Sequence, residues 1–355
     1  MTGLTLARSA SATVMGMQVY ERAIDERADA ALAAAVPGAR LHRAVVRSLR
    51  APLAGDRRLP MGLLHSGGPR LRREVARWAY PGDGPVHRLD LGLPPSPRGD
   101  VVTVHDVAPW RFAEEGGLPP AARAELARAD AVITVSDFSA GEIAELLGVD
   151  DAVVIPNGVD VDRFAGAVPL DAPALADLGV TGLYVLCAGG ASPRKNLDGL
   201  AAAWPLVRRA RPDLTLVLAG PPHPRRDALF APLEHTRRVG RVADDVLPGL
   251  LAGAAALVVP SLYEGFGLPA VEAMAAGVPV VAVRAGALPE VLGGTGVLTG
   301  PDPRELAEGV VWATSEDPEI GRLVDLARTR AQDCTWERSA ARHAQVWAQV
   351  IAARS

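Results

Sequence analysis

The chain has 355 residues, of which 49% are hydrophobic, and its formal net charge is −4 at pH 7. This length predicts two domains with separate cores, and the acidic balance argues against a dedicated nucleic-acid-binding protein. Cys187 and Cys334 are too few for a disulfide framework, and no apolar run reaches the roughly 20 residues that cross a bilayer. We therefore expect a cytoplasmic protein without an N-terminal signal peptide.

The sequence GPRLRREVARWAYPG at 68–82 predicts a helix in the first half of the chain. Helical spacing places Leu71, Val75 and Trp78 on one face and surrounds them with arginines. A basic amphipathic helix of this kind can lie on anionic lipid, which makes 68–82 a candidate for peripheral contact with the inner membrane face. The alternative is an ordinary domain helix with a solvated arginine face.

Further along, apolar runs predict strands at 100–107 and 130–136, with a helix at 120–129 between them. A strand at 152–160 leads into a turn. The Pro/Ala-rich stretch 165–179 is typical of a linker between domains.

The second half alternates buried strands with helices more clearly. Strands are predicted at 182–190, 214–220, 255–261 and 278–283, and helices at 196–210, 244–254 and 268–277. Such alternation indicates βαβ units and a parallel sheet. The tail 335–355 predicts a final helix.

These elements predict an α/β fold with two doubly wound, Rossmann-like parallel-sheet domains that face a cleft. The first would span 1–165 and the second 175–335, with the helix 336–355 packing back on the first. Ligands are expected at the carboxyl ends of the strands, facing the cleft.

The loop GGASPRKN, after the strand 182–190, has the character of a phosphate site. Gly189 and Gly190 permit close backbone approach, and the following helix contributes its positive end. Arg194 can grip phosphate oxygens with two parallel hydrogen bonds, and Lys195, the only lysine of the chain, adds a compact charge. The alternative is a solvated turn in which Asn196 caps the next helix.

A second glycine loop, in SLYEGFGLPAVEAMAAG at 261–277, again joins a strand to a helix. Glu264 precedes it, and Glu272 follows eight positions later, in the first turn of the predicted helix. A carboxylate can accept hydrogen bonds from both hydroxyls of a vicinal diol, so Glu272 suits a ribose and Glu264 a second polyol. Alternatively, Glu272 only complements the helix dipole and Glu264 is solvated.

These residues resemble the retaining glycosyltransferases of family 4, which have the GT-B fold. Glu264 and Glu272 match the E-x7-E motif of that family, and GGASPRKN is similar to its G-x-x-x-x-R-K-N loop. The resemblance covers about residue 100 to the end and is weak over 1–99. There, Gly16 stands in for the glycine-rich loop that the family has after its first strand.

The resemblance implies that the co-substrate is a nucleotide sugar, with Arg194 and Lys195 on its diphosphate, Glu272 on its ribose and Glu264 on its sugar. His105 would lie near the sugar hydroxymethyl group or the acceptor. Further donor contacts are expected from Gly16, Gly190, Val242, Gly265, Phe266, Gly267 and Leu268. No cofactor or metal is expected, because the two cations would replace the metal and the only D-x-D, at 160–162, is read as a turn.

The implied reaction transfers a hexose, with GDP-mannose favoured as donor over UDP- and dTDP-sugars. The acceptor would be a glycan, a lipid-linked sugar or a small metabolite, bound by the first domain. Front-side attack would retain the anomeric configuration, with the donor phosphate taking the acceptor proton. Two alternatives remain: a nucleotide-sugar epimerase of the same fold, and a non-catalytic, glycosyltransferase-like binding subunit.

Overall fold

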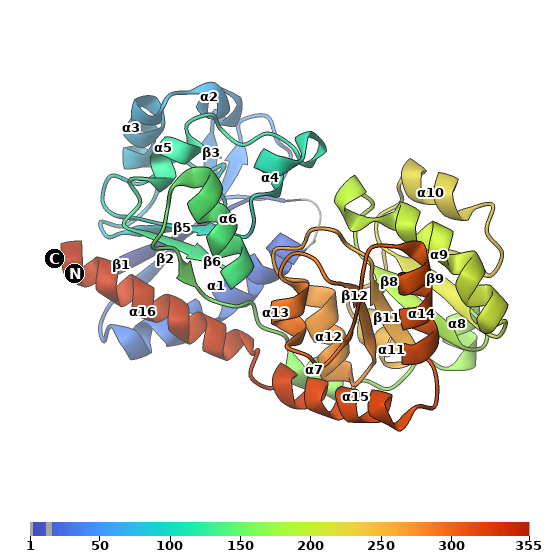
Figure 1. The fold of residues 1–355 in the computed structure, drawn as a ribbon. Helices are drawn as coiled ribbons and strands as arrows, with labels where there is room; N and C mark the ends of the chain where they lie inside the picture. Colours follow the sequence, from blue (N-terminus) through green and yellow to red (C-terminus); the bar gives the residue numbers. More distant parts are fainter. Residues whose placement is uncertain (1–2, 12–15, 355) are drawn as a thin grey trace. The chain divides into compact units, whose positions relative to one another are not determined.

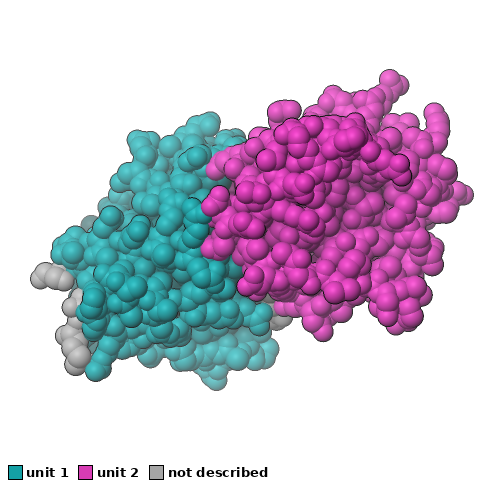
Figure 2. All heavy atoms as spheres, turned by 90° about the horizontal axis from the view of Figure 1, so that it is seen from below, with its two compact units in different colours: residues 1–158, 336–355 teal, residues 159–335 magenta. Residues whose placement is uncertain are grey.

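The computed structural model describes residues 3–11 and 16–354, which form two compact units (Figure 2). Residues 1–158 and 336–355 belong to unit 1, and residues 159–335 to unit 2. Each unit contains one parallel β-sheet with helices packed around it (Figure 1). The predicted α/β class with two doubly wound sheets is confirmed.

Unit 1 holds a seven-stranded sheet in the order β3-β2-β1-β4-β5-β6-β7. Its strands are β1 Gly3–Ser9, β2 Arg40–Ser48, β3 Arg57–Leu59, β4 Val86–Arg88, β5 Asp100–Val104, β6 Ala131–Thr134 and β7 Val153–Val154. Its helices are α1 Gly16–Ala35, α2 Met61–Ser66, α3 Pro69–Ala79, α4 Ala108–Arg111, the 3-10 turn Ala113–Glu115, α5 Ala122–Leu126, α6 Asp137–Leu147 and α16 Trp336–Arg354.

Unit 2 holds a six-stranded sheet in the order β10-β9-β8-β11-β12-β13. Its strands are β8 Tyr184–Ala188, β9 Thr215–Ala219, β10 Thr236–Gly240, β11 Ala256–Val259, β12 Val280–Val283 and β13 Val297–Thr299. Its helices are α7 Val161–Ala165, α8 Ala172–Asp177, the 3-10 turn Pro193–Lys195, α9 Leu197–Ala210, α10 Pro224–Phe230, α11 Leu247–Ala252, α12 Leu268–Ala276, α13 Leu288–Leu292, α14 Pro303–Ala313 and α15 Pro318–Ala331.

Both sheets reverse their strand order at one position. In unit 1 the reversal lies between β1 and β4, and in unit 2 between β8 and β11. The loops that leave two such neighbouring strands diverge to opposite sides of the sheet, which creates space for a ligand at their carboxyl ends. Each unit therefore has one position where the topology favours a binding site.

Helix α16 is held in unit 1 by a chain of buried hydrogen bonds whose direction can be worked out. His343 Nδ1 lies 2.8 Å from the carbonyl oxygen of Ser339, so this nitrogen must carry the hydrogen. Burial lowers the pKa of His343 to about 4, so the ring is neutral and its Nε2 accepts from Tyr20 Oη at 2.8 Å. Tyr20 in turn accepts from Thr103 Oγ1 at 2.8 Å.

The chain continues to the second tryptophan of α16. His87 Nε2 lies 2.8 Å from Thr103 Oγ1, and His87 Nδ1 accepts from Trp347 Nε1 at 3.1 Å. A neutral His87 that donates through Nε2 and accepts through Nδ1 satisfies both contacts, and burial does lower its pKa. The sheet, α1 and α16 are thus joined by bonds that require neutral histidines.

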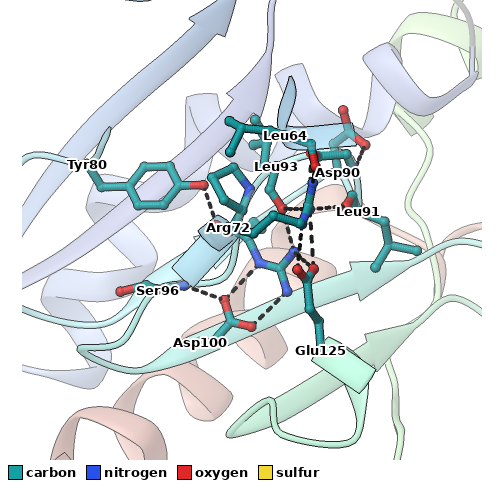
Figure 3. A network of polar contacts seen from close by, with 12 residues as sticks. Leu64, Arg72, Tyr80, Asp90, Leu91, Leu93, Ser96, Asp100 and Glu125 are labelled. Carbon is teal, nitrogen blue, oxygen red and sulfur yellow. Dashed lines mark hydrogen bonds and ion pairs between the residues drawn. The ribbon is translucent and has the colours of Figure 1, made fainter. Parts of the chain in front are cut away.

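A buried ion network explains the orientation of α3. Arg72 is fully buried and pairs with Glu125, while Arg88 pairs with Asp100 at 2.7 Å and reaches Glu125 at 3.7 Å (Figure 3). Both guanidinium groups also donate to the carbonyl oxygen of Leu93. Buried charges are stable only when paired in this way, so α3 must turn Arg72 towards the sheet.

The predicted helix at 68–82 is present as α3, and two of the three residues of its expected apolar face are exposed. Its buried residues are Arg72, Ala76 and Ala79, whereas Leu71 and Trp78 are 42% and 86% exposed. The stretch 165–179 also differs from the prediction. It contains α8, whose first turn is capped by Asp171. The backbone N–H of Leu170 donates to the carbonyl oxygen of Gly249, so the stretch is bonded within unit 2.

Candidate active site

The two glycine loops of unit 2 leave neighbouring strands at the reversal of its sheet. The first follows β8 and the second follows β11, which pair in parallel. Gly189 has φ +142°, a conformation that favours glycine, and nothing lies within 4 Å of a Cβ atom placed on Gly190. The backbone of the first loop is therefore open to close approach by a ligand.

Arg226, on α10, holds the carbonyl side of the first loop. Its guanidinium is buried and donates to the carbonyl oxygens of Gly189, Gly190 and Pro221. Burial lowers the pKa of Arg226. Sequence analysis missed this residue, because nothing in its local pattern shows that α10 reaches the loop after β8.

Lys195 and Arg194 both contact Glu264. The Nζ atom of Lys195 lies 2.6 Å from Glu264 Oε1, and an Nη atom of Arg194 lies 3.6 Å from Glu264 Oε2. Arg194 also donates to the carbonyl oxygen of Tyr263 at 3.1 Å. The structure thus brings together three predicted site residues, and the cations are not merely solvated. Asn196 also caps α9 by accepting from Gly199 N, as the alternative interpretation held.

Glu264 is held from several sides. Ser261, a buried residue that sequence analysis missed, donates to Glu264 Oε1 at 2.7 Å, and Ala287 N donates to the Glu264 carbonyl at 2.9 Å. Burial alone raises the pKa of Glu264. The charges of Lys195 and Arg194, together with the hydrogen bonds from Lys195 and Ser261, outweigh that effect and hold the pKa below its ordinary value. Glu264 is therefore ionised at neutral pH.

Glu272 has a different environment from Glu264. It is half-buried on α12, and among the residues that the structure describes it forms no hydrogen bond or ion pair. Burial raises its pKa to about 7; Arg163 opposes this shift and Asp244 adds to it. The predicted position in the first turn is wrong: Glu272 is the fifth residue of α12, where the helix dipole stabilises a carboxylate less.

The start of α12 presents backbone donors next to these carboxylates. Gly267 caps the helix with φ +98°, and a Cβ atom there would come within 2.9 Å of the Leu288 side chain. Gly265, Phe266 and Gly267 are buried, and Leu268 begins the helix. The first backbone N–H groups of a helix lack intrahelical partners, which suits a helix start for anionic or hydroxyl ligands. Pro269 has no N–H and Ala270 N donates to the Gly267 carbonyl oxygen at 2.9 Å, so in α12 the N–H of Leu268 is the donor offered to a ligand.

The remaining predicted donor contacts lie in separate places. Val242 is half-buried in the loop after β10, in unit 2. Gly16 is the exposed first residue of α1, in unit 1, and residues 12–15 of the predicted glycine stretch lie outside the described part of the chain. In the D-x-D at 160–162, Asp160 caps α7 by accepting from Arg163 N, which agrees with its reading as local structure.

His105 follows β5 in unit 1. Its ring packs edge-on against that of Tyr20, with 4.5 Å between the ring centroids. Its Nε2 is buried and has no hydrogen-bond partner among the residues that the structure describes. Burial lowers the pKa of His105 to about 4, an effect that Asp90 partly opposes. The unpartnered nitrogen distinguishes His105 from the hydrogen-bonded core residues His87 and His343, and it leaves a neutral imidazole available to a ligand.

Two findings concern ions and membranes. Within residues 3–11 and 16–354, no three His, Cys, Asp or Glu side chains are grouped so that they could hold a metal ion. Over the same residues, no helix combines the length and apolar character that crossing a membrane requires.

Comparisons with known proteins agree with the resemblance. A model of glycosyl transferases group 1 matches residues 182–316, and one of glycosyltransferase family 4 matches residues 32–163. O-antigen chain mannosyltransferase B of Escherichia coli is 32% identical over 270 residues, which are 71% of this chain and 70% of that protein. Phosphatidyl-myo-inositol mannosyltransferase of Mycobacterium tuberculosis is 31% identical over 293 residues, 76% and 75% of the two chains.

A solved structure extends the similarity to the whole fold. Sucrose-phosphate synthase from Thermosynechococcus elongatus superposes with a TM-score of 0.73 at 23% identity, covering 99% of this chain and 100% of that one. The expected GT-B fold is confirmed.

Proposed function

Because the chain belongs to glycosyltransferase family 4, we propose that it transfers a hexose from a nucleoside-diphosphate sugar to an acceptor hydroxyl, with retention and without a metal ion. The main observation that supports a donor site is that Lys195 and Arg194 pair with Glu264 at the sheet reversal of unit 2. Two cations beside an open glycine loop match the charge of a diphosphate.

We expect Glu272 and Glu264 to bind the two sugar rings of the donor. No residue in the described part of the chain forms a hydrogen bond or ion pair with Glu272, so its oxygens are available to the two hydroxyls of a ribose. Glu264 is ionised and fixed by Ser261, which suits it to orient the hydroxyls of the sugar. The buried backbone from Gly265 to Gly267 would complete the contacts.

The chemistry follows from the charge that develops on the leaving group. The bond between the anomeric carbon and the diphosphate oxygen breaks, and its electron pair goes to the diphosphate. Lys195 and Arg194 stabilise that growing charge, which is the largest contribution expected from the protein. The acceptor oxygen bonds to the same face of the sugar, and its proton passes to the departing diphosphate. A neutral His105 would contact the sugar hydroxymethyl group or the acceptor.

Mannose is the favoured sugar and GDP-mannose the favoured donor. The two relatives compared above are named as mannosyltransferases. UDP- and dTDP-sugars are the other donors to be tested, and the acceptor is a glycan, a lipid-linked sugar or a small metabolite. We place the reaction in the cytoplasm, where nucleotide sugars are made.

The proposal is tested by incubating the full chain with GDP-mannose, UDP-glucose and dTDP-glucose, with EDTA present and a panel of hydroxyl acceptors. We expect GDP-mannose to be consumed fastest, with an α-linked product. Epimerised donor without acceptor would indicate the epimerase instead, and binding of no nucleotide would support the non-catalytic subunit. An EDTA-inhibited reaction or a β-linked product would contradict metal independence or retention.

A peripheral membrane contact through 68–82 forms part of the proposal. Trp78, Leu71 and the neighbouring Leu63 of α2 are 86%, 42% and 61% exposed, beside the exposed arginines of α3. Apolar side chains flanked by arginines are typical of segments that lie on anionic lipid.

Co-sedimentation with vesicles tests this contact. We expect binding to phosphatidylglycerol vesicles that salt weakens, no binding to phosphatidylcholine, and loss in the double variant Leu71→Ser, Trp78→Ser. Leu326→Ser, at a leucine of unit 2 whose exposed fraction of 43% is close to the 42% of Leu71, is the control. Equal binding by the double variant would remove α3 from the proposal.

A further inference from the structure

The sheet reversal of unit 1 carries a second group of polar side chains, separate from the donor residues of unit 2. β1 ends at Ser9, and β4, its neighbour at the reversal, leads into Asp90. The hydroxyl of Ser9 donates to Asp90 Oδ2 at 2.5 Å, and Gly92 N donates to Oδ1 at 2.7 Å. Asp90 is thereby fixed at the carboxyl end of the sheet (Figure 3 labels it beside the ion network).

Glu21 of α1 is the unusual member of this group. The residue is only 2% exposed, and within 3–11 and 16–354 its buried Oε1 has no hydrogen-bond partner. The preceding residue, Tyr20, has partners on both sides. A buried carboxylate oxygen without a donor destabilises the folded protein, so its presence requires an explanation.

A second such atom follows the neighbouring strand: β5 pairs with β4 in parallel, so His105 leaves the sheet beside the segment that carries Asp90. His105 Nε2 is also buried with no hydrogen-bond partner in the described part of the chain, and the His105 ring packs against that of Tyr20. Asp90 is near enough to raise the pKa of both Glu21 and His105; burial, the larger effect, raises the pKa of Glu21 to about 7. Arg8 is the cation that opposes this effect on Glu21. Asp90, fixed at the end of β4, therefore acts electrostatically on both of these groups.

We propose that Glu21, Asp90 and His105 form a subsite for a neutral vicinal diol, supplied by a sugar ring or a cyclitol. Hydroxyls fit all three groups: they donate to the two carboxylates, and they can donate to or accept from a neutral imidazole in either tautomer. Two acidic groups against one arginine disfavour a phosphate or a carboxylate. The inference rests on the proposed function in one respect, since the diol would belong to the acceptor.

The test uses the full chain and three probes: methyl α-D-mannopyranoside, myo-inositol and the anionic mannose 6-phosphate, each titrated by saturation-transfer NMR. We expect at least one neutral polyol to bind more tightly than mannose 6-phosphate. Glu21→Gln should weaken that binding about fivefold or more, because one charged acceptor is lost. Glu26→Gln, an exposed glutamate on the same helix, is the matched control and should leave binding unchanged.

We do not expect a folding defect in Glu21→Gln that would obscure its effect on polyol binding. Glu21→Gln removes no protein hydrogen bond of Oε1 and no longer buries a charge, so its thermal stability at pH 8 should equal or exceed that of the parent. If Glu21 had only a structural role, Glu21→Gln would leave polyol binding unaltered, whatever its effect on stability. Asp90→Asn, which can still accept from Ser9, is the second variant and should also weaken polyol binding.

Three results would overturn the subsite: no binding of either neutral polyol, tighter binding of mannose 6-phosphate, or polyol binding unchanged in both variants. Titration of the same samples with GDP and UDP separates this inference from the proposed function. Nucleotide binding should survive Glu21→Gln. If nucleotides fail to bind while the polyol binds as expected, the proposed donor activity fails and the diol subsite stands.

Discussion

Lys195 Nζ lies 2.6 Å from Glu264 Oε1, although 69 positions separate the two residues in the chain. The contact joins the loop after β8 to the loop after β11 at the reversal of the second sheet. In the absence of donor, Glu264 is the counter-ion of both cations. A bound diphosphate would have to share Lys195 and Arg194 with that carboxylate.

Replacing Lys195 should therefore damage transfer more than folding. We expect Lys195→Ala to lower kcat/KM about 100-fold or more, because one stabilising charge on the leaving group is lost. Lys195→Arg should also fail, since a planar guanidinium differs in reach and shape from the ammonium group. Steady-state kinetics with GDP-mannose measures both effects.

The control for these variants is Arg209→Ala, at an exposed cation of α9. Lys195→Ala still leaves Arg194 and Ser261 on Glu264, so the melting temperature should fall only slightly. Full activity in Lys195→Arg would mean that the single lysine has no special role.

Glu272→Gln should affect stability and binding in opposite directions. The folded protein holds the Glu272 pKa at about 7, above the ordinary 4.5, so folding takes up a proton between these values. The protonated Glu272 therefore stabilises the folded parent at low pH, and this part of its free energy of unfolding is lost as pH rises from 4.5 to 7. The variant escapes the loss and should be more stable above pH 7, by roughly 1–2 kcal/mol.

The same variant should bind GDP at least about tenfold more weakly, because the ribose loses its charged acceptor. Urea unfolding at pH 5 and pH 8, with a nucleotide titration at pH 8, measures the two effects. A variant that gains stability and keeps its affinity would show that Glu272 does not contact the ribose.

Two glycines of unit 2 should respond differently to a methyl group. A Cβ atom on Gly220, at φ +144°, would come within 2.0 Å of the Gly189 carbonyl oxygen, whereas Gly190 has open space. We expect Gly220→Ala to lower stability by about 2 kcal/mol or more. Gly190→Ala should fold normally but weaken nucleotide binding about tenfold, because the methyl group occupies the approach of the diphosphate. Thermal melting and GDP titration separate the two, and unaltered GDP affinity in Gly190→Ala would exclude that approach.

The hydrogen-bond chain through Tyr20 and His343 should make unit 1 sensitive to acid. Burial holds the pKa of His343 at about 4, below the ordinary 6.5, with the Ser339 carbonyl opposing and His105 and Arg342 assisting. The unfolded chain therefore binds the proton first, and stability falls as pH drops from 6.5 to 4. His343→Gln should flatten this dependence by roughly 1–3 kcal/mol. Urea unfolding at pH 4.5, 5.5 and 6.5 measures it, and parallel profiles for parent and variant would refute the role of His343.

Much of the donor site could be predicted because its signals are local. Each of these signals joins residues that are close in the chain. Examples are the glycines before a helix, the eight-position spacing of Glu264 and Glu272, and Asn196 capping α9. Apolar runs alternating with helical spacing likewise predicted parallel sheets, since buried strands read as continuous apolar segments. Residues 1–99 offered fewer such runs, and most of their strands and helices were not foreseen.

Other features depended on which strands lie side by side. The sequence by itself determined the α/β class, the two glycine loops and the residue types in them. Only the tertiary structure decided that Lys195 pairs with Glu264, that Ser261 and Arg226 hold the site, and that Arg72 turns inward while Trp78 is exposed. The physical reason is that charge pairing and burial depend on neighbours brought together by the strand order, and no local pattern in the chain records those neighbours.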